Sequence, residues 1–143
     1  MNYTNDRCFV DTNILVYAHD SSSGEKNRKS RDLLNALWKT GNGLLSTQVL
    51  QEFFVIVTQK IPKAIPRHTA RLIIKSLGQW RLMLIDRETI LEAIDLQDLY
   101  RLSFWDALIM ETAIRGEARF LLSEDLQHGF EVGSITVVNP FNP

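Results

Sequence analysis

Two acidic residues in this sequence follow short apolar runs of the kind that form buried strands. Asp11 comes directly after the run CFV at residues 8–10, and Asp125 lies within SED, after the run RFLL at residues 119–122. If both runs are strands of a parallel sheet, both carboxylates lie beyond strand carboxyl ends, where such sheets bind ligands. Each also fits a structural role: Asp11 as a helix N-cap and Asp125 as a residue of a surface loop.

A third acid, Glu52, lies within an apolar helical stripe. Steps of three and four residues place it on one helix face with Val49, Phe53 and Ile56. Burial of an unpaired carboxylate is unfavourable, and no cationic residue lies one helical turn away. The structural alternative is a residue at the edge of the stripe whose carboxylate reaches water.

The fourth acid, Asp106, is the third residue after Ser103, so it can complete a capping box at the start of a helix. All four acids are then expected at the loop edge where a parallel sheet forms its crevice. Carboxylates gathered there would repel one another strongly unless a hard cation such as Mg²⁺ or Mn²⁺ were bound. Such ions activate water and neutralise phosphate charge, so the four acids predict metal-assisted phosphodiester hydrolysis.

Alternating helices and strands are predicted to position these acids. The expected helices span residues 26–39, 48–60, 67–77, 86–102 and 103–116, with Thr47, Asp86 and Ser103 as candidate caps. The expected strands span residues 8–10, 44–46, 81–86, 119–122 and 135–140. This alternation is typical of a parallel sheet covered on both faces, and no repeat or linker interrupts it. We therefore expect one three-layer α/β/α domain over residues 1–143.

The composition is that of a globular protein. The chain has 143 residues, of which 45% are hydrophobic and 23% charged, and its net charge is −1. A polyanionic partner must therefore be held by a local patch. The single cysteine, Cys8, excludes an internal disulfide and is expected in the core. With no signal-peptide pattern and no apolar run of about twenty residues, a cytoplasmic protein without a membrane partner is expected.

Four segments, in order, resemble the acidic motifs of PIN-domain ribonucleases: FVDTNILVYA, STQVLQEFF, SFWDALIMETA and FLLSEDLQHG. The likeness is greatest to the VapC-type toxins of bacterial toxin–antitoxin pairs and extends from Cys8 to about Pro140. The resemblance implies a PIN-like α/β/α fold and an endoribonuclease that depends on Mg²⁺ or Mn²⁺. It also implies an RNA substrate, a homodimer and a small antitoxin that obstructs the acidic pocket.

The resemblance also implies roles for individual residues. The catalytic acids would be Asp11, Glu52, Asp106 and Asp125. Of these, Asp11, Asp106 and Asp125 would bind the metal directly, and Glu52 would act through a second ion or an ordered water.

Polar neighbours would support the acids. Asn13 would tether a second carboxylate or a water, Ser123 matches a hydroxyl position of the family, and Thr12 is expected to cap the following helix. Many members have Thr-x-Asp where this chain has Ser123-Glu124-Asp125. Either Glu124 or Asp125 can therefore face the metal, and Asp125 is favoured.

Candidate contacts to RNA lie on two predicted helices. Arg67, Arg71 and Lys75 recur at four-residue steps, and residues 26–31 form a second basic cluster. The structural alternative for each is a solvated helix face. Phe104 and Trp105 are expected to pack rather than to stack on bases. Apolar residues between positions 53 and 61 and from 72 to 77 exceed the needs of one helix face, so they can supply a dimer or antitoxin groove, although core burial explains many of them.

Two other functions compete with a nuclease. One is phosphoryl transfer through an aspartyl intermediate in a Mg²⁺-dependent phosphotransferase or phosphatase, which commonly has a second Asp two residues after the first. That position is Asn13 in this chain. The other is a non-catalytic PIN-like module that binds RNA or protein, for which intact acids would be unnecessary.

Overall fold

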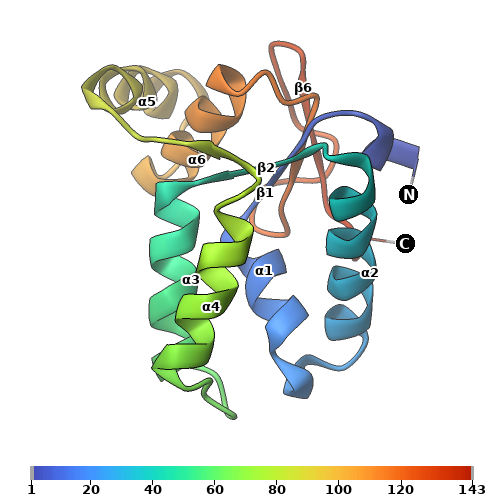
Figure 1. Cartoon of the computed structure of the whole chain (residues 1–143). Coiled ribbons are helices and arrows are strands. Elements are labelled where there is room, and N and C mark those ends of the chain that lie inside the picture. Colours follow the sequence, from blue (N-terminus) through green and yellow to red (C-terminus); the bar gives the residue numbers. More distant parts are fainter. Residues whose placement is uncertain (1, 143) are drawn as a thin grey trace.

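Helices and short strands alternate along most of the chain (Figure 1). The structure is a computed structural model, and it describes residues 2–142. The helices are α1 (Thr12–His19), α2 (Glu25–Thr40), α3 (Thr47–Gln59), α4 (Arg67–Leu77), α5 (Arg87–Tyr100) and α6 (Phe104–Arg115), with short 3₁₀ turns at Asn2–Asn5 and Ser21–Ser23. The strands are β1 (Cys8–Val10), β2 (Gly43–Ser46), β3 (Arg81–Met83), β4 (Phe120–Leu122), β5 (Glu131–Val132) and β6 (Ile135–Val138).

The six strands form one sheet in the order β3-β2-β1-β4-β6-β5. All neighbouring pairs are parallel except β5 and β6, which are antiparallel. From β1 the chain builds outward through β2 to β3, and then returns to place β4 on the other side of β1. The strand order therefore changes direction between β1 and β4, which is where open α/β sheets form their ligand crevice.

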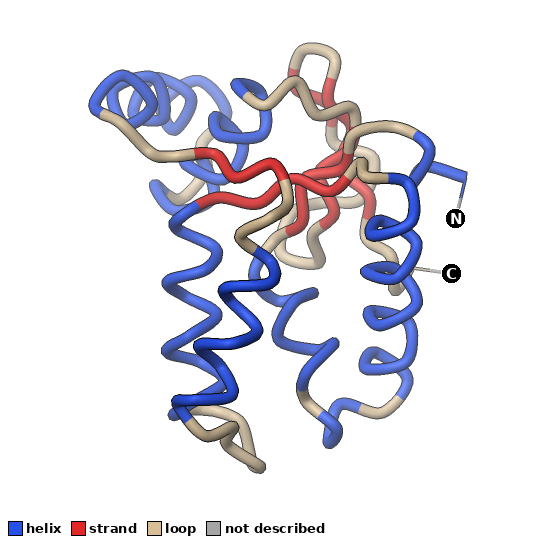
Figure 2. The backbone as a smooth tube through the Cα atoms, viewed as in Figure 1, coloured by secondary structure: helices blue, strands red, loops and turns tan. Residues whose placement is uncertain are grey.

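Helices cover both faces of this sheet (Figures 1 and 2). Helices α1 to α4 lie below the sheet in this view, and α5 and α6 lie on the opposite side. Because both of its faces are covered, β1 is apolar at every position, and Cys8, Phe9 and Val10 are fully buried. The predicted α/β/α fold is confirmed, and Cys8 is a core residue.

Most predicted elements are observed, and the differences concern short elements, strand ends and caps. Strand β5 was not expected, because two residues are too short to show an alternating pattern. Strand β3 ends at Met83 rather than Asp86, since Asp86 caps α5 by accepting from the backbone N–H of Thr89. The cap of α3 is Ser46, which accepts from the N–H of Val49, so the expected cap at Thr47 was wrong by one residue. Among residues 2–142, no helix is long and apolar enough to cross a bilayer.

Candidate active site

Asp11 lies at the carboxyl end of β1, where it serves as the N-cap of α1. Its Oδ1 accepts a 2.7 Å hydrogen bond from the N–H of Thr12, and its Oδ2 accepts a 2.8 Å bond from the hydroxyl of Ser123. Only 6% of the residue is exposed. Burial raises the pKa of Asp11 to about 6, the nearby charges of Asp125 and Glu52 add to the rise, and the two hydrogen bonds oppose it.

Glu52 is held near Asp11 by Thr12. The hydroxyl of Thr12 donates a 2.7 Å hydrogen bond to Oε1 of Glu52, which is half-buried on α3. The expectation that Thr12 caps α1 was wrong, because Asp11 already occupies the cap position. The hydroxyl of Thr12 is therefore available to orient a second carboxylate.

Asp106 lies on α6 and Asp125 lies in the loop after β4, and both are near Asp11 and Glu52. Ser103 caps α6 by accepting a 3.1 Å bond from the N–H of Asp106. Asp125 accepts a 2.9 Å bond from Nδ2 of Asn13, as expected for a residue that tethers a second carboxylate. Burial raises the pKa of Asp125, and the negative charges of Asp106 and Glu124 raise it further. Asp106 and Asp125 therefore lie close enough to interact electrostatically.

These four acids line one cavity of about 90 Å³. Its other lining residues are polar or apolar, without a basic side chain: Thr12, Asn13, Gln48, Ile56, Trp105 and Ile109. None of the ion pairs found among residues 2–142 involves any of the four acids. We call this space the acid cavity. This geometry agrees with the expectation that acids distant in the sequence converge without cationic partners.

Gln48 also lines the acid cavity, although the sequence analysis did not single it out. It is 5% exposed, and its Oε1 has no hydrogen-bond partner among the described residues. A buried carbonyl oxygen without a donor is unfavourable unless a ligand or water satisfies it. The signal was present in the sequence, because Gln48 lies four residues before Glu52 and so shares its helix face.

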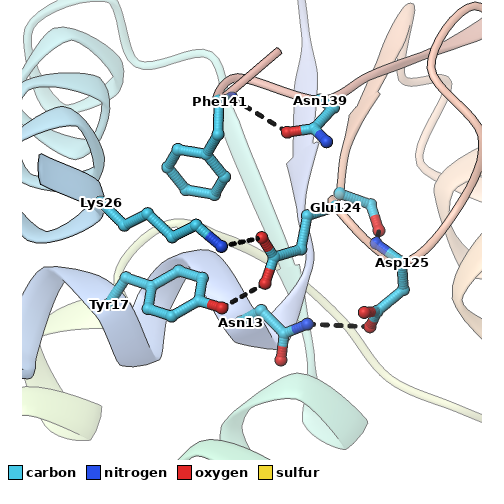
Figure 3. Close-up of polar contacts among 8 residues, drawn as sticks. Asn13, Tyr17, Lys26, Glu124, Asp125, Asn139 and Phe141 are labelled. Carbon is cyan, nitrogen blue, oxygen red and sulfur yellow. Dashed lines mark hydrogen bonds and ion pairs between the residues drawn. The ribbon is translucent and has the colours of Figure 1, made fainter. Parts of the chain in front are cut away.

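Glu124 and Asp125 are adjacent but point to different partners (Figure 3). Glu124 accepts hydrogen bonds from the hydroxyl of Tyr17 and from Nζ of Lys26, the latter at 2.8 Å. Asp125 turns toward Asn13 and the acid cavity. The sequence did not determine which of these two acids faces the cavity. In the structure Asp125 lines the cavity, and Glu124 links the loop to α1 and α2.

The basic stripe on α4 does not reach the acid cavity. Arg67 and Arg71 line a separate cavity of about 320 Å³, together with Phe54, His68 and Ile74. Lys75 is exposed and lines neither cavity. The stripe thus borders the apolar surface between α3 and α4 that the sequence marked as a candidate groove.

In the second basic cluster, residues 26–31, two side chains form intramolecular ion pairs. Lys26 pairs with Glu124, and Arg28 pairs with Glu25 and Asp32 on its own helix. For Arg28 this agrees with the structural alternative of a solvated helix face.

The expectation that Trp105 packs was wrong. The residue is 61% exposed and lines the acid cavity, whereas Phe104 packs against a small cluster formed by Ala93, Ala107 and Leu108. Hydrophobic character favours burial on average, but it does not determine which of two adjacent aromatic residues faces the core.

The donors of the acid cavity fit a hard cation. They are carboxylate oxygens and the unpartnered carbonyl oxygen of Gln48, the ligand types that Mg²⁺ and Mn²⁺ prefer. Within residues 2–142, no three His, Cys, Asp or Glu side chains already form a set that could hold an ion. Hydrogen bonds hold Asp11, Glu52 and Asp125 to different donors, and Mg²⁺ commonly keeps several waters that can bridge to such ligands.

Comparison with known proteins identifies the family. The chain belongs to the PIN domain family, whose model matches residues 8–130. A solved structure described as a toxin–antitoxin complex from Klebsiella pneumoniae is similar, with a TM-score of 0.71 and 20% identity over 95% of this chain and 99% of that chain. VapC20 of Mycobacterium tuberculosis, described as a toxin that cleaves the sarcin–ricin loop, has a TM-score of 0.58 and 16% identity over 80% of this chain and 86% of that chain. These likenesses concern the fold, and no curated protein matches the sequence significantly.

Proposed function

We propose that this chain is a metal-dependent endoribonuclease of the VapC type, which hydrolyses RNA phosphodiester bonds at the acid cavity as a single PIN domain over residues 1–143. One observation carries the proposal. Four carboxylates from four separate segments line one small cavity that, within the described part of the chain, no basic side chain enters. Such an arrangement is unfavourable by itself and favourable around a cation that works on phosphate.

The carboxylates of Asp11, Asp106 and Asp125 would hold Mg²⁺ or Mn²⁺, and Glu52 would take part through a second ion or an ordered water. A bound ion lowers the pKa of water and neutralises charge on the scissile phosphate. The chain's polar residues would orient the acids, Ser123 by its bond to Asp11, Thr12 by its bond to Glu52 and Asn13 by its bond to Asp125. These bonds keep the acids in place before substrate arrives.

An antitoxin partner and an RNA substrate follow from the same proposal. One structural neighbour is a toxin–antitoxin complex, and the structural match covers 99% of the neighbour's chain. Another is described as a toxin that cleaves the sarcin–ricin loop. The apolar cavity between α3 and α4, with Arg67 and Arg71 at its border, would supply part of a homodimer or antitoxin surface. An enzyme that acts on cellular RNA in this way would work in the cytoplasm.

The test is a cleavage assay on total RNA with Mg²⁺, with Mn²⁺ and with EDTA, followed by mapping of the cut ends. Wild-type protein should cut in either metal and not in EDTA. Asp11→Asn and Asp106→Asn should abolish cutting without loss of folding, while Asp95→Asn, an exposed acid on α5 that does not line the cavity, should cut at the wild-type rate.

The outcomes separate the competing functions. Cleavage that survives EDTA, or that survives in a folded Asp11→Asn protein, would contradict the proposal. Binding of RNA without cleavage in Mn²⁺ would favour the non-catalytic module, and a trapped acyl-phosphate on Asp11 would favour phosphoryl transfer. The partner of Asp125 in the structure is the amide of Asn13, at the position where a phosphotransferase commonly has an acid.

A further inference from the structure

An exposed tryptophan borders the acid cavity. Trp105 is 61% exposed and lines the cavity directly beside Asp106 in the sequence. Single exposed apolar side chains are common on protein surfaces and need no explanation alone. Other such residues, including Trp38 and Leu99, do not line this cavity. Its location is therefore what distinguishes Trp105.

The indole ring is supported from one side. Its edge-to-face neighbour is Phe104, with ring centroids 5.2 Å apart and planes at 74°. Phe104 in turn packs against Ala93, Ala107 and Leu108, and the hydroxyl of Ser103 caps the helix start that carries both rings. The ring is thus attached to a fixed helix end while most of its surface stays accessible. A rigid aromatic surface with few rotatable bonds is well suited to stacking.

The charge of the acid cavity favours a contact to RNA that does not depend on charge. RNA carries a phosphate on every nucleotide, and the cavity contains four carboxylates with no basic side chain in its lining. A divalent ion can neutralise the cavity, but attraction to the rest of the strand must come from elsewhere. Stacking of a base on an aromatic ring does not depend on charge, and it contributes about 1–3 kcal/mol per base.

We infer that Trp105 is a stacking platform for one unpaired nucleobase next to the phosphate that enters the acid cavity. The inference rests on the proposed function, and it names Trp105 as the residue that holds the base beside the scissile phosphate. A base within a duplex is stacked on its neighbours and is not available to the ring.

The test measures binding separately from cleavage. In an Asp11→Asn background, which should not cut, affinity is measured for a short single-stranded RNA of mixed sequence in Mg²⁺. Adding Trp105→Ala should weaken binding by roughly 5- to 150-fold, the factor that corresponds to one stacked base. Trp105→Phe should recover much of this loss. Leu99→Ala, which removes a 71%-exposed apolar side chain from α5 outside the cavity, should have no effect.

A duplex and a series of abasic RNAs identify the base that contacts the indole ring. The same RNA annealed to its complement should bind weakly, and its affinity should not depend on Trp105. In a series of RNAs that each lack one base, a single position should weaken binding to the Asp11→Asn protein and have no further effect once Trp105 is alanine. If every abasic position affects the two proteins equally, or if Trp105→Ala binds the single strand as tightly as its parent, the stacking platform is overturned.

Failure of this inference is distinguishable from failure of the nuclease proposal. Wild-type cleavage combined with Trp105-independent binding would leave the nuclease in place and remove the platform. Trp105-dependent binding of single strands by a wild-type protein that cuts no RNA would support the platform and remove the nuclease.

Discussion

The hydroxyl of Ser123 donates a 2.8 Å hydrogen bond to Oδ2 of Asp11, although the two residues are 112 positions apart in the sequence. The bond is possible because Val10 and Leu122, the last residues of β1 and β4, are paired in the parallel register. The same hydroxyl accepts a 3.1 Å bond from the N–H of Asp125. One fully buried side chain therefore positions two of the four acids.

Ser123→Ala should impair both stability and RNA cleavage. It removes the donor to Oδ2 of Asp11 and the acceptor for the N–H of Asp125, at an expected loss of about 1–3 kcal/mol of folding free energy. Loss of an orienting partner typically lowers metal-site activity by about 10- to 100-fold. Chemical denaturation and initial cleavage rates measure the two effects.

Ser30→Ala is the matched control. Ser30 is also fully buried, but its hydroxyl has no partner within residues 2–142. The control should cleave RNA at the wild-type rate and be at least as stable as wild type. Equal effects of the two substitutions would remove the assigned role of Ser123.

In metal-free protein, the contribution of Asp11 to folding stability should fall as the pH rises from about 4 to about 6. Burial raises the pKa of Asp11 to about 6 from its ordinary 3.8, so in this window the folded state keeps a proton that the unfolded state has released. The unfolded state is therefore favoured as the pH rises, by up to about 3 kcal/mol for this group, and the change levels off above its folded pKa.

The difference between wild type and Asp11→Asn isolates this effect. The free energy of unfolding of both proteins is measured by urea denaturation in EDTA from about pH 4 to neutral pH. The difference between them should change with pH and favour the variant at neutral pH. Parallel stability curves for the two proteins would show that Asp11 titrates normally in the folded state.

Gln48→Met should stabilise the protein and reduce its activity. Methionine has a similar shape, and it removes the carbonyl oxygen that has no partner in the described part of the chain, for an expected gain of about 1 kcal/mol. If the amide contacts an ion, a water or RNA in the acid cavity, cleavage should fall several-fold. Thermal unfolding and cleavage rates are measured beside Gln51→Met, an exposed position on the same helix, which should change neither. A variant that loses stability would indicate that the amide is satisfied in solution.

Lys26→Met should weaken the attachment of the loop that carries Asp125. The ammonium group pairs with Glu124 at 2.8 Å and lies 5.0 Å from the ring centre of Tyr17 and 5.4 Å from that of Phe141. Because the Lys26 side chain is 45% exposed, the expected loss of stability is modest, about 1 kcal/mol, with a few-fold loss of cleavage.

Arg28→Met provides the comparison on the same helix. Arg28 pairs only with exposed acids, so its replacement should leave both stability and cleavage close to those of wild type. If both lysine and arginine variants behave like wild type, the loop does not depend on the Lys26–Glu124 pair.

The fold and the acids were predictable because they depend on local patterns. Short apolar runs predicted β1 and β4, and the carboxyl ends of parallel strands meet at one edge, so Asp11 and Asp125 were expected together. Chain order and periodicity are sufficient to place the strands and these two acids. The resemblance to PIN-domain ribonucleases, not the pattern, implied that Asn13 tethers a second carboxylate or a water, and in the structure its partner is Asp125.

The remaining features depend on side-chain directions that local patterns do not determine. Glu124 and Asp125 are neighbours in one loop, and only the positions of Tyr17, Lys26 and Asn13 decide which acid faces the cavity. Both Phe104 and Trp105 were expected to pack, but only Phe104 packs against the small cluster beside α6, and Trp105 is exposed. Gln48 was overlooked because a neutral amide gives no charge signal.

The measurement that tests the account most directly is a titration of Mn²⁺ followed by electron paramagnetic resonance near neutral pH. Free Mn²⁺ gives a strong signal that weakens on binding, so the titration reports on the acid cavity without RNA. Wild type and Asp95→Asn should bind Mn²⁺ equally, and Asp11→Asn and Asp106→Asn should bind it at least about tenfold more weakly. If wild-type protein leaves the Mn²⁺ signal unchanged, or if Asp106→Asn binds as wild type does, the acids do not form a metal site.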